Sequence, residues 1–298
     1  MHRRSTVEAA PPSPDLARRG FVAAASLAGG LGGFAPAAGA ADAAVTETDV
    51  TIETPDGHCD AAYFHPAAGK HPGVIVWTDA FGLRPSMRGI GRRLAAQGYA
   101  VLVPNPFYRV AKSPVVESAA NFDFTDKTAF DKLRPLMASV GAAGAAERDA
   151  RAFVGFLDAQ AAVDRAKPVG TQGYCMGGAL VVRTAAALPE RIGAGASFHG
   201  GGLVTDKPDS PHRLAPKIKA RMYFGIASND DQRQPDAKDD LEEAFEAAKN
   251  PATIVVYPAR HGWCVPDMPK EAGSPIYNEA EAERAWAALL ALYRGALG

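Results

Sequence analysis

The stretch Gly173-Tyr174-Cys175-Met176-Gly177-Gly178 lies between an apolar run and a run of helix-forming residues. Its form is Gly-x-Cys-x-Gly, which is typical of a nucleophile on a sharp turn from a strand to a helix. The flanking residues must be small, because the backbone of the nucleophile is strained and close to its neighbours. Cysteine stands where this turn usually carries serine, so the stretch predicts a thiol nucleophile.

Strand and helix patterns alternate on both sides of this turn. Apolar runs predict strands at 73–77, 100–104, 168–174, 192–198, 220–226 and 252–257. Helical spacing predicts helices at 86–98, 145–157, 176–188, 236–249 and 278–297, and two extended runs at 50–54 and 61–64 predict an opening hairpin. The alternation predicts an α/β fold with one mostly parallel sheet and helices on both faces. Residues 110–143 fit the pattern poorly and are expected to form either a lid or rim insertion or an inert surface excursion.

The first forty residues resemble an export signal rather than part of a fold. Arg18-Arg19 precedes a weakly apolar run rich in Ala and Gly, and Ala38-Gly39-Ala40 is a plausible cleavage site. The run is too short and too weak for a membrane span. We expect a twin-arginine signal at 1–40, cleaved to leave a periplasmic or secreted protein that is not inserted in the membrane. A plain Ala/Pro-rich leader is the alternative.

Bulk composition excludes several classes of function. The chain of 298 residues is 47% hydrophobic with a net charge of −1, which favours a soluble globular protein with no nucleic-acid partner. Histidine and acidic residues show no metal-ligand spacing, so no metal and no organic cofactor is implied. Three cysteines are too few for a disulfide scaffold. In an oxidising compartment, a Cys59–Cys264 pair would leave Cys175 free, but the sequence cannot show this pairing.

A thiol nucleophile needs a base, and the base needs an orienting acid. His261 follows the last predicted strand, and loops at the carboxyl ends of parallel strands gather catalytic groups. The preceding strand is followed by Asp230 and Asp231, of which we favour Asp230. His199 also follows a strand and is a weaker candidate for lining the site. The remaining mature histidines lie in polar turns, at His58, His65, His71 and His212.

The chain resembles the dienelactone hydrolase family from about Val50 to its last helix. The resemblance rests on the cysteine turn, on Asp230, and on His261-Gly262-Trp263. It also rests on two segments that follow predicted strands, Thr78-Asp79-Ala80-Phe81-Gly82-Leu83 and Pro104-Asn105-Pro106-Phe107-Tyr108-Arg109. Several matched segments in the same order are more specific than any one of them. The resemblance implies a single α/β-hydrolase domain over residues 41–298.

The resemblance also implies roles for individual residues. Cys175 would attack a carbonyl carbon, His261 would carry the proton, and Asp230 would hold His261. The backbone N–H groups of Met176 and Ala80 would form the oxyanion hole. Asp79 stands where the family has a glutamate that activates the thiol, and Arg109 matches an arginine that helps to bind a substrate carboxylate. Tyr108 and Trp263 are expected to line the substrate site.

The implied enzyme is a carboxylic ester or lactone hydrolase that acts on a small molecule, as a monomer or a small homo-oligomer. A second carboxylate-binding arginine, which the family has shortly after the histidine, is missing from Trp263-Cys264-Val265-Pro266. The alternative is a non-catalytic small-molecule-binding protein that retains the fold. A redox protein is a second alternative, but no C-x-x-C motif supports it.

Overall fold

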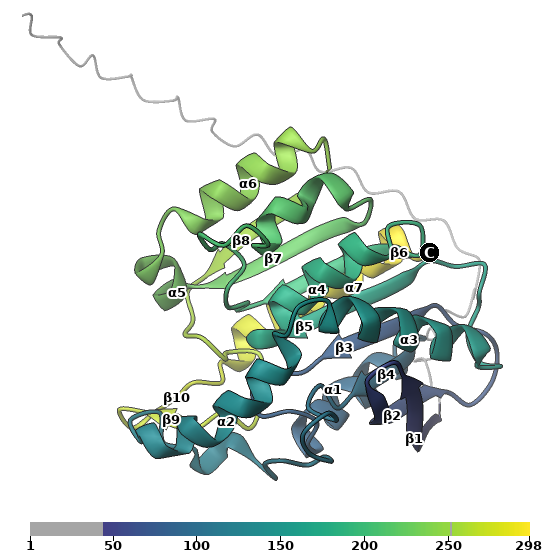
Figure 1. Cartoon of the computed structure of the whole chain (residues 1–298), viewed down its shortest axis with the longest axis horizontal. Helices are drawn as coiled ribbons and strands as arrows, with labels where there is room; N and C mark the ends of the chain where they lie inside the picture. The colour runs from purple at the N-terminus through teal and green to yellow at the C-terminus, as the bar shows by residue number, and fades with distance from the viewer. Residues whose placement is uncertain (1–43, 251) are drawn as a thin grey trace, which may run out of the picture. The chain divides into compact units, whose positions relative to one another are not determined.

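The computed structural model describes residues 44–250 and 252–298 (Figure 1). The expected export signal lies outside the described residues. No helix of the described part is long and apolar enough to span a membrane.

Eight strands form one sheet in the order β1-β2-β4-β3-β5-β6-β7-β8. Strand β2 pairs antiparallel with β1 and β4, whereas the six strands from β4 to β8 in that order pair in parallel. The bounds are β1 (Val45–Thr54), β2 (Gly57–Pro66), β3 (Gly73–Trp77), β4 (Ala100–Pro104), β5 (Val169–Tyr174), β6 (Ile192–Phe198), β7 (Arg221–Ala227) and β8 (Ala252–Tyr257). The predicted mostly parallel sheet is confirmed.

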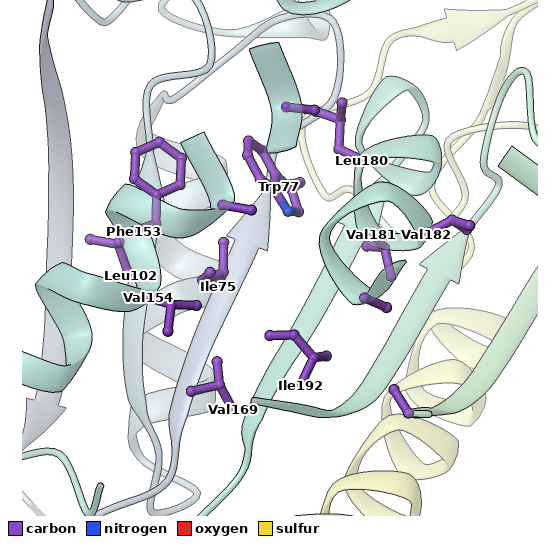
Figure 2. Close-up of a cluster of buried hydrophobic side chains, with 14 of the residues drawn as sticks. Ile75, Trp77, Leu102, Phe153, Val154, Val169, Leu180, Val181, Val182 and Ile192 are labelled. Carbon is purple, nitrogen blue, oxygen red and sulfur yellow. The ribbon is translucent and has the colours of Figure 1, made fainter. Parts of the chain in front are cut away.

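Helices cover both faces of this sheet, as predicted. On one face lie α3 (Ala145–Ala159), α4 (Met176–Ala187) and α6 (Ala237–Ala247), and on the other lie α1 (Pro85–Ala95) and α7 (Glu279–Ala296). Figure 2 shows part of the first interface, in which Phe153 of α3 and Leu180 of α4 lie with the sheet residue Trp77.

Strands β3 and β4 are apolar throughout because both of their faces are buried. Ile75 and Trp77 of β3 pack into the cluster under α3 and α4, whereas Val74 and Val76 pack into the cluster under α1 and α7. Successive strand residues point to opposite faces, so a strand covered on both sides has no position for an exposed polar residue.

The segment 110–143 contains structure that the sequence pattern did not predict. It includes a short 3-10 helix, η1 (Ala119–Asn121), and helix α2 (Lys127–Val140). Only Leu133 and Val140 of α2 are buried, and Pro135 lies inside the helix, so the apolar periodicity is weak. Figure 1 shows α2 close to the small ribbon formed by β9 (Lys270–Glu271) and β10 (Ser274–Pro275).

The remaining elements lie between the later strands. They are η2 (Pro211–Lys217), which precedes β7, and the short helix α5 (Ser228–Arg233), which follows it. Helix α5 occupies the stretch that was expected to be an acid-bearing loop.

All three cysteines are free, so the possible Cys59–Cys264 disulfide is not formed. Cys59 packs in the cluster beneath α3 and α4, and Cys264 packs against the cluster on the opposite face of the sheet. Their positions in different layers explain why the two thiols do not pair.

Candidate active site

Cys175 occupies the turn between β5 and α4 with a positive φ of 51° and a ψ of −116°. Few residues other than glycine adopt such a φ, and strain of this kind is typical of functional sites. A Cβ atom added to Gly173 would lie 2.2 Å from the carbonyl oxygen of Gly177, and one added to Gly177 would lie 2.6 Å from that of Trp77. The two glycines are therefore required by the close approach of the backbone, which holds Cys175 at the tip of the turn.

His261 and Asp230 meet beside this cysteine, although His261 lies in the loop after β8 and Asp230 lies in α5 after β7. The Nδ1 atom of His261 lies 2.6 Å from Oδ2 of Asp230. The side chain of Asn229 holds the loop that carries His261, because its Oδ1 accepts a hydrogen bond of 2.8 Å from the His261 backbone N–H. Asp231, the alternative acid, is instead bound by Lys238 at 2.8 Å. The structure thus brings Cys175, His261 and Asp230, which the sequence singled out, into one place.

The surroundings of His261 favour its charged form. Burial alone would lower the pKa of His261, but the negative charge of Cys175 and hydrogen bonds to Asp230 and Cys175 raise it to about 10. The first turn of α4 adds unpaired N–H groups and the positive end of a helix dipole next to the sulfur. This arrangement places a charged imidazolium and the positive end of a helix dipole beside the sulfur of Cys175.

His199 connects the nucleophile and the base. Its Nδ1 accepts a hydrogen bond of 3.1 Å from the backbone N–H of Cys175, and its ring packs edge-on against His261 with centroids 4.8 Å apart. His199 is 1% exposed, has a φ of 40°, and its Nε2 has no hydrogen-bond partner among the described residues. Burial and the neighbouring charge of His261 hold the pKa of His199 well below its usual value, so the ring is neutral. The sequence offered only its position after a strand as a signal.

A cavity of about 350 Å³ opens beside the cysteine. It is lined by polar residues near the nucleophile and by apolar residues farther away, namely Asp79, Ala80, Phe81, Phe124, Phe130, Leu133, Cys175, His199, Asn229, Arg233, His261, Met268, Glu271 and Ile276. Phe124, Phe130 and Leu133 come from the segment 110–143, so this segment contributes a wall of the cavity.

The two predicted oxyanion donors are placed near the nucleophile. Met176 is the first residue of α4, where backbone N–H groups have no acceptor within the helix. Ala80 lines the cavity in the segment that follows β3. Both positions are compatible with donation to an oxygen that is bound next to Cys175.

The carboxylate of Asp79 faces an arginine instead of the thiol. Arg84 donates to both of its oxygens, at 2.7 Å and 2.9 Å, and also binds both oxygens of Asp267 at 2.8 Å. The backbone N–H of Phe81 donates to Asp79 as well, at 2.9 Å. Burial alone would lower the pKa of Arg84, but the two carboxylates raise it above its usual value, so the group stays a cation. The thiol contact expected for Asp79 is thus replaced by an ion pair with a residue that sequence reasoning missed.

Arg109 and Tyr108 lie away from the cavity. Arg109 is held between Asp149 and Asp56, with contacts of 2.6 Å and 2.7 Å, and its side chain is only 13% exposed. The hydroxyl of Tyr108 donates to Asp149 at 2.7 Å and lies 2.8 Å from the hydroxyl of Thr54. The substrate-binding role expected for both residues is therefore corrected: they join the β1–β2 turn to α3.

Trp263 packs against His199 and Tyr257 in the interior next to the site. It is fully buried, stacks on Tyr257 with ring centroids 4.8 Å apart, and meets the edge of His199 at 5.2 Å. Because Trp263 is absent from the lining of the cavity, it packs behind the histidines and does not face a substrate. The described residues contain no cluster of His, Cys, Asp and Glu that could hold a metal ion.

Comparisons with known proteins point to one family. A model of the dienelactone hydrolase family matches residues 59–297. A carboxymethylenebutenolidase of Pseudomonas sp. is 30% identical over 205 residues, which cover 68% of this chain and 79% of the relative. Carboxymethylenebutenolidase 1 of Cupriavidus pinatubonensis is 27% identical over 237 residues, or 78% of this chain and 89% of the relative.

Solved structures share the fold. A dienelactone hydrolase-like promiscuous phosphotriesterase from metagenomic libraries has a TM-score of 0.68 at 23% identity, covering 86% of this chain and 100% of that chain. A dienelactone hydrolase from Anabaena variabilis has a TM-score of 0.56 at 17% identity, covering 85% and 99%. At these identities the likeness concerns the fold alone.

Proposed function

Because the chain belongs to the dienelactone hydrolase family, we propose that it cleaves a carboxylic ester or lactone through a thioester formed at Cys175. The observation that carries the proposal is the 2.6 Å pair of His261 and Asp230 beside a cysteine with a strained backbone. These groups line one cavity with room for a small molecule.

The first half of the reaction transfers the acyl group to sulfur. The Cys175 thiolate attacks the carbonyl carbon, and the backbone N–H groups of Met176 and Ala80 stabilise the negative oxygen. The carbon–oxygen bond to the leaving group then breaks, and the imidazolium of His261 gives its proton to the departing oxygen. Asp230 keeps the ring oriented throughout.

The second half releases the acid. His261, now neutral, takes a proton from a water molecule, and the resulting oxygen nucleophile attacks the thioester carbon. The carbon–sulfur bond breaks, the thiolate returns, and the protonated His261 pairs with it again. The product is a carboxylic acid, so atoms and charges balance over the cycle.

Hydrolysis of p-nitrophenyl acetate and of small lactones tests the proposal. Cys175→Ala should abolish turnover, whereas Cys264→Ala should leave it intact because Cys264 is not part of the lining of this cavity. Iodoacetamide should alkylate Cys175 in the folded protein. An inert Cys175 and unchanged turnover in Cys175→Ala would favour the non-catalytic binding protein instead.

We further propose that the protein acts outside the cytoplasm. The support is the sequence alone: Arg18-Arg19, the weakly apolar run and the small residues at 38–40 resemble a twin-arginine signal. Export through this route carries folded proteins, so the active site would be complete before the chain crosses the membrane.

A further inference from the structure

We propose that the cavity beside Cys175 selects neutral esters that carry an aromatic group. This inference rests on the proposed hydrolase function and specifies its substrate class. Two kinds of residue line the cavity: the proposed catalytic groups, and a set of apolar side chains, called the apolar wall, which consists of Phe81, Phe124, Phe130, Leu133, Met268 and Ile276.

The wall is built from interlocked phenylalanine rings. Phe122, which does not line the cavity, packs against three of these rings. Its ring centroid lies 4.8 Å from that of Phe81, 5.3 Å from that of Phe124 and 5.2 Å from that of Phe130, and the two rings of each pair are steeply inclined. Edge-to-face pairs of this kind are a preferred packing of aromatic rings. Three of the four rings, those of Phe81, Phe124 and Phe130, line the cavity.

One ring of the wall still exposes apolar surface. Phe124 is 40% exposed, which is unusual for a phenylalanine that belongs to a packed cluster. An apolar group bound against it would remove this surface from water and would stabilise the complex by roughly 25 cal/mol per Å². An aromatic ring suits this position because it can extend the edge-to-face pattern.

The wall lies next to the reacting groups. Phe81 directly follows Ala80, the expected oxyanion donor, and its own N–H is bound by Asp79. Phe81 therefore places the apolar wall next to the expected oxyanion donor, where the scissile carbonyl would bind. The cavity volume of about 350 Å³ accommodates the carbonyl and one ring.

The charges in the cavity disfavour a substrate carboxylate. Arg233 is the only arginine or lysine among the described lining residues; its side chain is 72% exposed and lies 3.3 Å from Asp230. Glu271 also lines the cavity, and the charge of His261 is paired with Asp230 at 2.6 Å. Arg84 is already bound by Asp79 and Asp267, as described above. A carboxylate in this cavity would lose its hydration and meet only Arg233, whose charge is exposed to solvent and shared with Asp230.

Four esters test the selection in a pH-stat, which records release of the acid. Ethyl phenylacetate carries the ring on the acyl side, phenyl acetate carries it on the alcohol side, ethyl acetate lacks a ring, and monoethyl succinate carries a carboxylate. We expect kcat/KM for ethyl phenylacetate to exceed that for monoethyl succinate by at least about tenfold. A preference for monoethyl succinate would overturn the inference.

Variants of the wall give an independent readout. Phe124→Ala should raise KM for the aromatic esters by roughly five- to tenfold and leave ethyl acetate unchanged, while Phe124→Arg should improve hydrolysis of monoethyl succinate. Val110→Ala is the matched control, because Val110 is exposed in the same segment but does not line the cavity. An equal effect of Phe124→Ala on all four esters would contradict the inference.

Failure of this inference differs from failure of the proposed function. If the esters are hydrolysed in a manner that depends on Cys175 but without the aromatic preference, only the inference fails. If none is hydrolysed, the proposed function fails. Calorimetric titration of Cys175→Ala with ethyl phenylacetate and with monoethyl succinate then decides the inference: tighter binding of the neutral ester supports it, and equal or weaker binding contradicts it.

Discussion

The Nδ1 atom of His199 accepts the backbone N–H of Cys175 at 3.1 Å, so a second histidine holds the nucleophile in place. The same ring packs against His261, the proposed base. This acceptor role requires a neutral ring, which burial and the charge of His261 maintain by lowering the pKa of His199.

Replacing His199 tests this positioning role. His199→Phe keeps a ring but removes the Nδ1 acceptor, and should lower kcat by roughly fivefold because an orienting hydrogen bond contributes about 1 kcal/mol. KM for ethyl acetate should not change. Thermal stability should be equal or higher, because the unpartnered Nε2 is removed from the interior. An unchanged kcat would contradict the role, and His58→Phe on the surface is the control.

The buried ion pairs of Arg84 with Asp79 and Asp267 are expected to contribute strongly to stability. Arg84→Met should lower the free energy of unfolding by roughly 3–5 kcal/mol, because the carboxylates of Asp79 and Asp267 lose their counter-ion. Arg88→Met, which removes ion pairs of the more exposed Arg88 with Glu47 and Asp49, should cost less than about 1 kcal/mol. Urea unfolding measures both. A small effect of Arg84→Met would show that the buried carboxylates find other partners.

The titration of His261 follows from its raised pKa. Because the folded value lies above the usual 6.5, the ring should stay protonated through neutral pH and lose its proton only as the pH rises through about 10. In Cys175→Ser the thiolate charge is absent, so proton NMR should show this loss at a lower pH. The same His261 titration in both proteins would contradict a thiolate–imidazolium pair.

The export proposal predicts the location of the protein in cells. Arg18→Lys together with Arg19→Lys should retain the precursor in the cytoplasm, because twin-arginine export depends on this pair. Arg3→Lys with Arg4→Lys is a matched control, since this pair does not directly precede the apolar run. Immunodetection in periplasmic and cytoplasmic fractions measures both. Continued export of the Arg18 and Arg19 variant would refute the signal.

Local sequence patterns predicted the parts of the site that depend on local backbone geometry. The glycines beside Cys175 predicted the turn because close backbone contacts leave no room for a Cβ atom. Asp230 and His261 were found because each follows a strand of a parallel sheet, and the carboxyl ends of such strands share one edge.

Contacts between distant segments could not be predicted in this way. Arg84 binds Asp267 across 183 positions of the chain, and no local pattern indicates such a pair. Arg109 matched a family position, but Asp149 and Asp56 bind it in this chain. The contributions of Phe130 and Leu133 to the cavity depend on how α2 packs, and the weak periodicity of that helix hid them.

Rapid-quench mass spectrometry of the enzyme mixed with phenyl acetate tests the central claim most directly. We expect the mass of one acetyl group to appear transiently on the peptide that contains Cys175, and to persist longer in His261→Ala, which cannot activate water. Turnover without this acetyl group, or its attachment to another residue, would contradict the assignment of Cys175 as the nucleophile.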